Sequence, residues 1–332
     1  MNLLKILFSL ASIISTYACN LSIKGDKLLL NDVYINNGSE AEGLLINSRM
    51  IQGISDGFEN WPYPDTKSWD ANRNTAEFIT QMSHWNERGL NGFTIGMQGG
   101  APTKNTSKQT HRNSAYHNNG DLKADYMNRL KMILKESNRL NMIVILSLFY
   151  RSQVDIFSSY SDILKATENT IFWIKENNFT NIIIEPVNEC EFSEFKKYKL
   201  NCNQNIPKLL DLINKYKIPS GNSYKGGGVP SDNIIGNSSI ILLHGNSLNS
   251  ESEYTTQLKS VKNSKAYRGQ PIIYNEAGTK LFLDWAVKNK VGWGYYDQGS
   301  NNYIDGFQSP PINWSINTSK KKAFFNEIEK YV

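Results

Sequence analysis

The chain has few of the residues that build metal centres or disulfide scaffolds. Its 332 residues include three cysteines, and its four histidines, His84, His111, His117 and His244, lack the spacing of a zinc site. So few cysteines exclude a small disulfide-rich fold, because such a fold depends on several bridges. We therefore expect neither a metal nor a cofactor. The hydrophobic content of 39% is enough for a sizeable core.

A concentrated charge of one sign is also missing. The formal net charge is only +5, and the lysines and arginines are scattered along the chain. Since a nucleic-acid site needs a basic patch, usually with interleaved aromatic side chains, we expect no nucleic-acid partner.

Long hydrophobic runs are absent after the N-terminus. Residues 1–18 combine one basic residue, Lys5, with an apolar stretch and a small final residue, Ala18, which is typical of a secretory signal peptide. The apolar stretch is shorter than the ~20 residues of a membrane span. We expect a secreted, monomeric protein without a transmembrane span. Cys19 leaves lipid anchoring open as an alternative, although Thr16 replaces the aliphatic residue usual three positions before such a cysteine.

The other two cysteines, Cys190 and Cys202, flank one loop. In an oxidising compartment they are expected to form a disulfide. The bond would restrain the segment that follows Glu189.

The remaining sequence alternates between strand-like and helix-like segments. A β-hairpin is predicted over 21–35, with a turn at Gly25 and Asp26. Helices are predicted at 75–88, 122–139, 159–176, 206–216, 252–261, 281–288 and 319–331, and strands at 49–53, 92–97, 142–149, 181–189, 218–223, 239–244, 271–276 and 291–296. Eight such units without a linker predict a single (β/α)8 TIM barrel over 19–332. The sequence fits an open doubly wound sheet less well, because the Gly-rich phosphate-binding turn of that fold does not follow the first strand.

Two of these strands end in glutamate. Three isoleucines lead to Asn188 and Glu189, and the segment 271–278 carries Glu276 at the end of its apolar run. Barrel chemistry lies at the C-terminal ends of the strands. Two carboxylates at that rim are the minimum that cleavage of a glycosidic bond requires.

Further polar and aromatic residues lie at or beside other strand ends, and we predict that they bind substrate. They are Gln98, Tyr224, His244 and Trp293, the last with a flat face for a sugar ring. Glu185 shares a strand face with Glu189 but lies deeper in the barrel. Because an unpaired charge there is costly, we expect it to have a structural partner, Arg49 being the candidate.

The two glutamate motifs resemble those of glycoside hydrolase clan A, the cellulase-like (β/α)8 hydrolases. In that clan an Asn-Glu pair ends the fourth strand and a second Glu ends the seventh, where this chain has Asn188, Glu189 and Glu276. The resemblance implies that Glu189 is the general acid/base, that Glu276 is the nucleophile, and that Asn188 binds the sugar 2-hydroxyl.

We therefore predict a retaining hydrolase of β-linked glycans. Its mechanism requires a raised pKa for Glu189 and an ionised Glu276, with His244, Tyr274 or Tyr224 as the hydrogen-bond partner of Glu276. The strand must end irregularly for Asn188 and Glu189 to face one site. A non-catalytic glycan-binding protein on a degenerate barrel remains the alternative, because the chain departs from the clan after the second and third strands. An Arg often found near the second strand has no counterpart, and Phe149, Tyr150 and Arg151 replace a His-bearing motif after the third.

Overall fold

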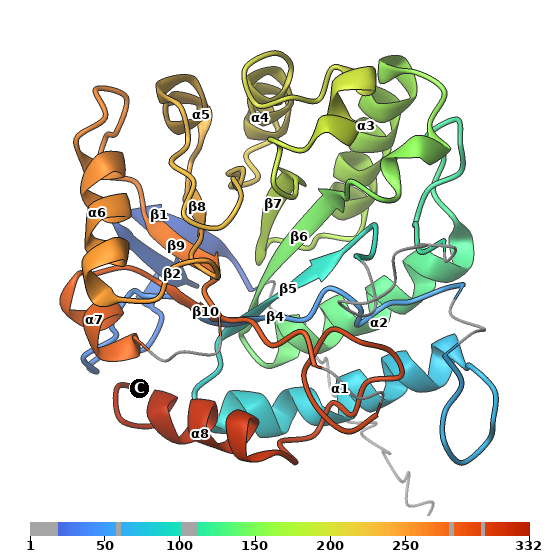
Figure 1. Ribbon diagram of the computed structural model, residues 1–332, viewed down its shortest axis with the longest axis horizontal. Helices are drawn as coiled ribbons and strands as arrows, with labels where there is room; N and C mark the ends of the chain where they lie inside the picture. The colour runs from blue at the N-terminus through green and yellow to red at the C-terminus, as the bar shows by residue number, and fades with distance from the viewer. Residues whose placement is uncertain (1–18, 58–60, 101–111, 279–281, 300–302) are drawn as a thin grey trace, which may run out of the picture.

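The computed structural model, which describes residues 19–57, 61–100, 112–278, 282–299 and 303–332, is a (β/α)8 barrel with strands inside and helices outside (Figure 1). The predicted fold is confirmed, while the predicted signal peptide lies outside the described residues. The barrel strands are β4 (Ile46–Arg49), β5 (Gly92–Gly96), β6 (Ile143–Phe149), β7 (Ile182–Val187), β8 (Ile241–His244), β9 (Ile272–Glu276) and β10 (Trp293–Tyr295).

Amphipathic helices cover the strands from outside (Figure 1). They are α1 (Ala71–Glu87), α2 (Ala124–Arg139), α3 (Tyr160–Glu176), α4 (Ile206–Lys215), α5 (Asp232–Asn237), α6 (Glu251–Lys262), α7 (Leu283–Lys288) and α8 (Ser319–Ile328). Local sequence fixes where several begin. Ser159 and Ser250 form capping boxes at α3 and α6, and Asp70 accepts two backbone N–H bonds at α1.

The strands run parallel, as the alternation of strands and helices predicts. Hydrogen-bonded neighbours follow the order β10-β4-β5-β6-β7, and β8 pairs with β9. An isolated bridge between Ile273 and Gly292 joins β9 to β10. All eight positions therefore point their C-terminal ends toward one rim of the barrel.

The fifth barrel position is not a regular strand, which corrects the prediction for 218–223. The segment makes one bridge, Ser220 to Ile184, and Ser220 also accepts backbone bonds from Ser239 and Ile240. Pro219 has no N–H to donate to a ladder. The Val187 N–H donates to the side-chain Oδ1 of Asn222 at 2.9 Å rather than to a backbone carbonyl. Side-chain bonds thus replace part of the ladder next to the candidate site.

The first barrel strand also starts and ends earlier than predicted. It spans Ile46–Arg49, whereas the prediction was 49–53, because the chain turns at Met50, whose carbonyl accepts the Gly53 N–H. This shift puts Arg49 at the C-terminal end of β4. Arg49 therefore lies at the C-terminal rim of the barrel, whereas the predicted strand had it at the N-terminal end.

The N-terminal hairpin closes the opposite end of the barrel. Strands β1 (Leu21–Lys24), β2 (Lys27–Leu30) and β3 (Val33–Tyr34) pair antiparallel around the predicted turn. Leu28, Leu30 and the buried thiol of Cys19 pack with Ile143 and Ile183 from the N-terminal ends of β6 and β7. This apolar plug covers the N-terminal end of the barrel, away from the two glutamates.

Within the described residues, no helix has the length and apolar character that crossing a membrane would require.

Candidate active site

Glu189 lies just beyond the end of β7, where the strand becomes irregular. Its φ of +54° is in the left-handed region, which is uncommon for a residue other than glycine. Its backbone N–H donates to Ser223 Oγ at 3.1 Å, so the irregular fifth segment supports the turn. This departure from strand geometry is the one that the sequence required for Asn188 and Glu189 to serve one site.

Glu276 is the last residue of β9 and faces Glu189 across the barrel mouth. The β8–β9 pairing is irregular between Leu243 and His244, which puts His244 opposite Glu276. Both carboxylates are largely covered, with 15% of the Glu189 side chain and 7% of the Glu276 side chain exposed. Two strands distant in sequence therefore deliver their glutamates to one sheltered place.

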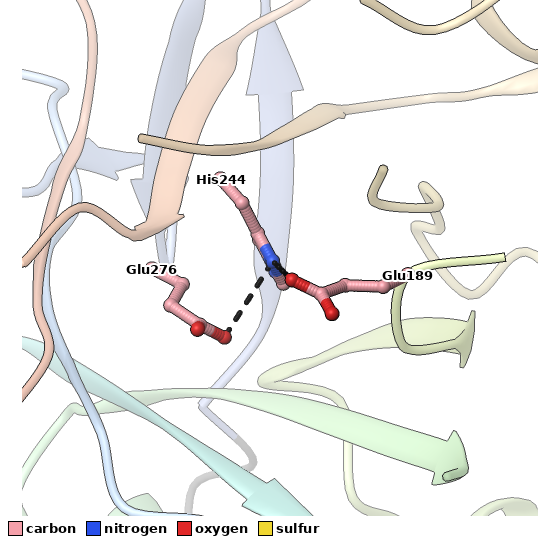
Figure 2. A group of neighbouring side chains, drawn as sticks. All are labelled: Glu189, His244 and Glu276. Carbon is pink, nitrogen blue, oxygen red and sulfur yellow. Dashed lines mark hydrogen bonds and ion pairs between the residues drawn. The ribbon is translucent and has the colours of Figure 1, made fainter. Parts of the chain in front are cut away.

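His244 lies between the two glutamates (Figure 2). Its Nδ1 is 3.0 Å from Glu189 Oε1 and 3.5 Å from Glu276 Oε2. One carboxylate oxygen from each glutamate and one ring nitrogen of His244 all lie within 4.8 Å of one another. Such a trio could also hold a metal ion, although the neighbouring Arg49 charge opposes cation binding.

Arg49 connects the second glutamate to Asn188. Its Nε forms a buried ion pair with Glu276 Oε2 at 2.9 Å, and its Nη2 donates to Asn188 Oδ1 at 2.8 Å. With these two contacts the guanidinium holds both Glu276 and Asn188 in fixed orientations. Removing either partner of the ion pair would leave a buried charge uncompensated.

The sequence left three candidates for the partner of Glu276, and the structure decides among them. Tyr274 donates to the Tyr254 carbonyl, and Tyr224 bonds Ser231, so neither hydroxyl reaches the site. His244 does reach it. The shortest hydrogen bond to Glu276 comes from Asn246, whose Nδ2 donates to Oε1 at 2.6 Å.

The pKa of Glu189 shifts in the direction opposite to the predicted one, and the pKa of Glu276 is raised. Burial raises the pKa of Glu276, although the Arg49 and His244 charges oppose this. Burial would also raise the pKa of Glu189, but the bond and charge of His244, helped by Arg49, lower it. The His244 pKa is raised, since the carboxylate charges outweigh its burial. In the free protein the proton between His244 and Glu189 therefore resides mainly on His244.

Three predicted substrate-binding residues have other roles. Gln98 donates to Ser114 Oγ and accepts the Tyr150 N–H, so it fixes loops. Tyr224 is buried against Ser231. Trp293 is fully buried and packs on Tyr254, from α6 outside the barrel. The expected sugar stacking on Trp293 is wrong in this structure, because its ring faces the helical layer.

Glu185 is fully buried beneath the site, as its strand position predicted. Arg49, the predicted structural partner, interacts with Glu185 through charge: burial would lower the pKa of Arg49, but Glu276 and then Glu185 raise it. The nearest polar contacts of Glu185 Oε1 are Asn275 Nδ2 at 3.5 Å and His244 Nε2 at 3.9 Å.

The predicted disulfide between Cys190 and Cys202 is present. It closes the loop that contains the short 3-10 helix η2 (Ser193–Tyr198), and Cys190 directly follows Glu189. The Cys190 N–H also bonds the Ser223 carbonyl at 3.4 Å. The bridge thus restrains the segment on which Glu189 sits.

Replacing Cys190 by Ser should lower both stability and activity. The two cysteines are 12 residues apart in the sequence. On the chain-entropy model, loss of a bridge that closes such a loop lowers the free energy of unfolding by about 3 kcal/mol, which is about 4–5 °C in Tm for a protein of this size. Calorimetry of Cys190→Ser and Cys202→Ser tests this. Equal losses in the two variants identify the bond as the cause, whereas an unchanged Tm in both contradicts the prediction.

The sequence indicated Asn246 only as one of the polar residues at a strand end, and it did not indicate Arg49 or Tyr296 as residues of the site. Arg49 was interpreted as a structural partner of Glu185. Tyr296, which follows β10, lies close enough to Glu276 that this carboxylate's charge helps to raise the tyrosine pKa well above its ordinary value, although burial is the larger cause. Arg49 could have been recognised only from the correct C-terminal end of β4, which the periodicity did not place.

Comparison with known proteins shows similarity at the level of structure. No protein-family model matches the chain, and no curated protein matches its sequence. A GH5 xyloglucan-specific endo-β-1,4-glucanase from a metagenomic library, solved with cellotriose, matches with a TM-score of 0.55 at 14% identity, covering 87% of this chain and 97% of that one. The β-mannanase of the blue mussel Mytilus edulis matches with 0.55 at 11%, covering 95% and 97%.

A third match is the β-1,4-D-mannanase of Cryptopygus antarcticus, with a TM-score of 0.55 at 12% identity, covering 93% of this chain and 94% of that one. At such identities the matches show the fold alone. The cellulase-like (β/α)8 hydrolase fold predicted from the two glutamate motifs is therefore confirmed.

Proposed function

We propose that the protein is a retaining β-glycoside hydrolase with Glu276 as nucleophile and Glu189 as general acid/base. The observation that carries the proposal is the convergence of the two glutamates, with one oxygen of each within 4.8 Å of the other at the open rim. Retaining enzymes have carboxyl groups about 5–5.5 Å apart, whereas inverting enzymes need about 6.5–9.5 Å to admit water.

The reaction follows from this geometry. Glu276 attacks the anomeric carbon while Glu189 protonates the leaving oxygen, and water then breaks the glycosyl ester after losing a proton to Glu189. Arg49 and Asn246 hold Glu276 by one hydrogen bond to each oxygen. Asn188, whose side chain is held by Arg49, is the proposed partner of the sugar 2-hydroxyl.

The lowered pKa of Glu189 and the raised pKa of His244 fit a proton that the two groups share. Nδ1 of His244 and Oε1 of Glu189 are 3.0 Å apart, so one proton moves between them without rearrangement of either side chain. When a leaving oxygen replaces water beside Glu189, that proton passes from His244 to Glu189 and then to the substrate. In the resting enzyme, His244 therefore carries the proton that Glu189 later donates to the leaving oxygen.

The proposed substrate class is a β-linked glucan or mannan. The similar structures include a xyloglucan-specific endo-β-1,4-glucanase and β-mannanases, one of which was solved with mannohexaose. Secretion is part of the proposal, and residues 1–18 and the disulfide support it. The burial of the Cys19 side chain favours free secretion over lipid attachment at that thiol.

Mechanism-based labelling tests the function. We expect a 2-deoxy-2-fluoro β-glycoside of glucose or mannose, or of the corresponding disaccharide, to add one glycosyl group to the protein, mapped by mass spectrometry to Glu276. Excess cellotriose or mannotriose should slow labelling. Modification of another residue would overturn the assignment of the nucleophile. Glycan binding with neither labelling nor turnover would favour the non-catalytic binding protein.

A further inference from the structure

The buried carboxylate of Glu185 has no evident structural purpose. It is fully buried, and its Oε2 has no hydrogen-bond partner among the residues that the structure describes. Its other oxygen receives one long bond, from Asn275 at 3.5 Å. Besides this bond, its charge acts on the buried Arg49 guanidinium, whose pKa Glu276 and Glu185 raise against the effect of burial. Because a buried carboxylate with an unbonded oxygen is costly, we expect a further interaction nearby.

That interaction is with the inner face of His244. Nε2 of the imidazole lies 3.9 Å from Glu185 Oε1 and has no hydrogen-bond partner within the described part of the chain. The outer nitrogen, Nδ1, faces Glu189 and Glu276. A carboxylate on one side of an imidazole favours the tautomer that carries its proton on that side.

We infer that Glu185 is a positioning residue, which keeps His244 protonated at Nε2 so that Nδ1 is the nitrogen exchanging a proton with Glu189. The inference rests on the proposed function. In the acid step Nδ1–H becomes Nδ1, Glu189 passes that proton to the leaving oxygen, and the neutral imidazole keeps its Nε2–H toward Glu185. In the second step the proton that water gives to Glu189 returns to Nδ1.

The surrounding charges explain why this carboxylate matters. The charged and titratable groups that face His244 or its carboxylate partners are Glu185 and Glu189 from β7 and its end, Glu276 from β9, Arg49 from β4, Tyr150 and Arg151 after β6, and Tyr296 after β10. Arg49 bonds Glu276 and Asn188, and the charge of Glu185 also acts on it. Glu185 is the one carboxylate of the three that has no role in the bond-breaking steps, so its charge is free to stabilise the imidazolium.

Glu185→Gln tests the inference, because it removes the charge with little change of volume. Loss of a neighbouring negative charge lowers the pKa of His244, so the alkaline limb of the kcat/KM profile should move to lower pH by about one unit. Activity at pH values above the limb should fall about tenfold, and activity well below it should stay within about twofold. Glu176→Gln, the same change at an exposed position at the end of α3, should leave the profile unchanged.

Nitrogen NMR of the protein labelled in its histidines gives a second measurement that does not depend on turnover. In the wild-type protein, whatever the folding of the variant, we expect Nε2 of His244 to stay protonated while Nδ1 titrates. In Glu185→Gln the same titration should move to lower pH. An Nε2 that loses its proton first would overturn the inference, as would equal loss of activity at every pH. Correct NMR behaviour in a protein without glycosidase activity would instead reject the proposed function alone.

Discussion

Glu276→Ala should lose turnover of a β-glucan or β-mannan by about 10⁴-fold while the protein stays folded. The residue ends β9 at the open rim, and its carboxylate is the group that attacks the anomeric carbon. The loss is measured on soluble polysaccharide by release of reducing ends. Glu176→Ala removes an exposed carboxylate at the end of α3 and should retain full activity.

Azide identifies the role of the missing carboxylate. In the cavity left by Glu276→Ala, azide should attack an activated aryl β-glycoside and produce the glycosyl azide of inverted configuration. Loss of the ion pair with Arg49 also leaves a buried cation, so circular dichroism and Tm must be measured alongside. Full activity of the variant, or an azide product of retained configuration, would contradict the nucleophile assignment.

Glu189→Ala should have an effect that depends on the leaving group. Polysaccharide cleavage needs a protonated leaving oxygen and should fall by about 10³-fold or more. An aryl glycoside with an acidic phenol needs no such proton, so its first step should be nearly unaffected and the glycosyl-enzyme should accumulate. Rapid-mixing measurements should show a burst of phenol followed by slow turnover.

The azide product again separates the two carboxylates. With Glu189→Ala, azide should speed the second step and produce the glycosyl azide of retained configuration, because Glu276 still forms the covalent intermediate. Equal losses on natural and activated substrates would contradict the role of Glu189 as the acid. The variant should keep the disulfide between Cys190 and Cys202, which follows it in the chain.

Hydrophobic periodicity was enough to predict the barrel and most of its elements. The isoleucine-rich runs of β7 and β9 can be buried only between layers, and the helices alternate with them along the chain. Periodicity did not place the ends of β4, because Met50 and Ile51 are as apolar as strand residues. Periodicity also could not show that the segment from Ser220 to Asn222 would make side-chain hydrogen bonds in place of a regular backbone ladder.

The sequence by itself determined that Glu189 and Glu276 meet at one rim, because parallel strands in a barrel end on the same side. It also determined the disulfide, since Cys190 and Cys202 flank a single loop. Only the tertiary structure decided which groups surround the carboxylates. Arg49, His244 and Asn246 reach them through side-chain directions and a bulge that no local pattern encodes. The protonation order was decided there as well, because a pKa depends on burial and on charges from several strands at once.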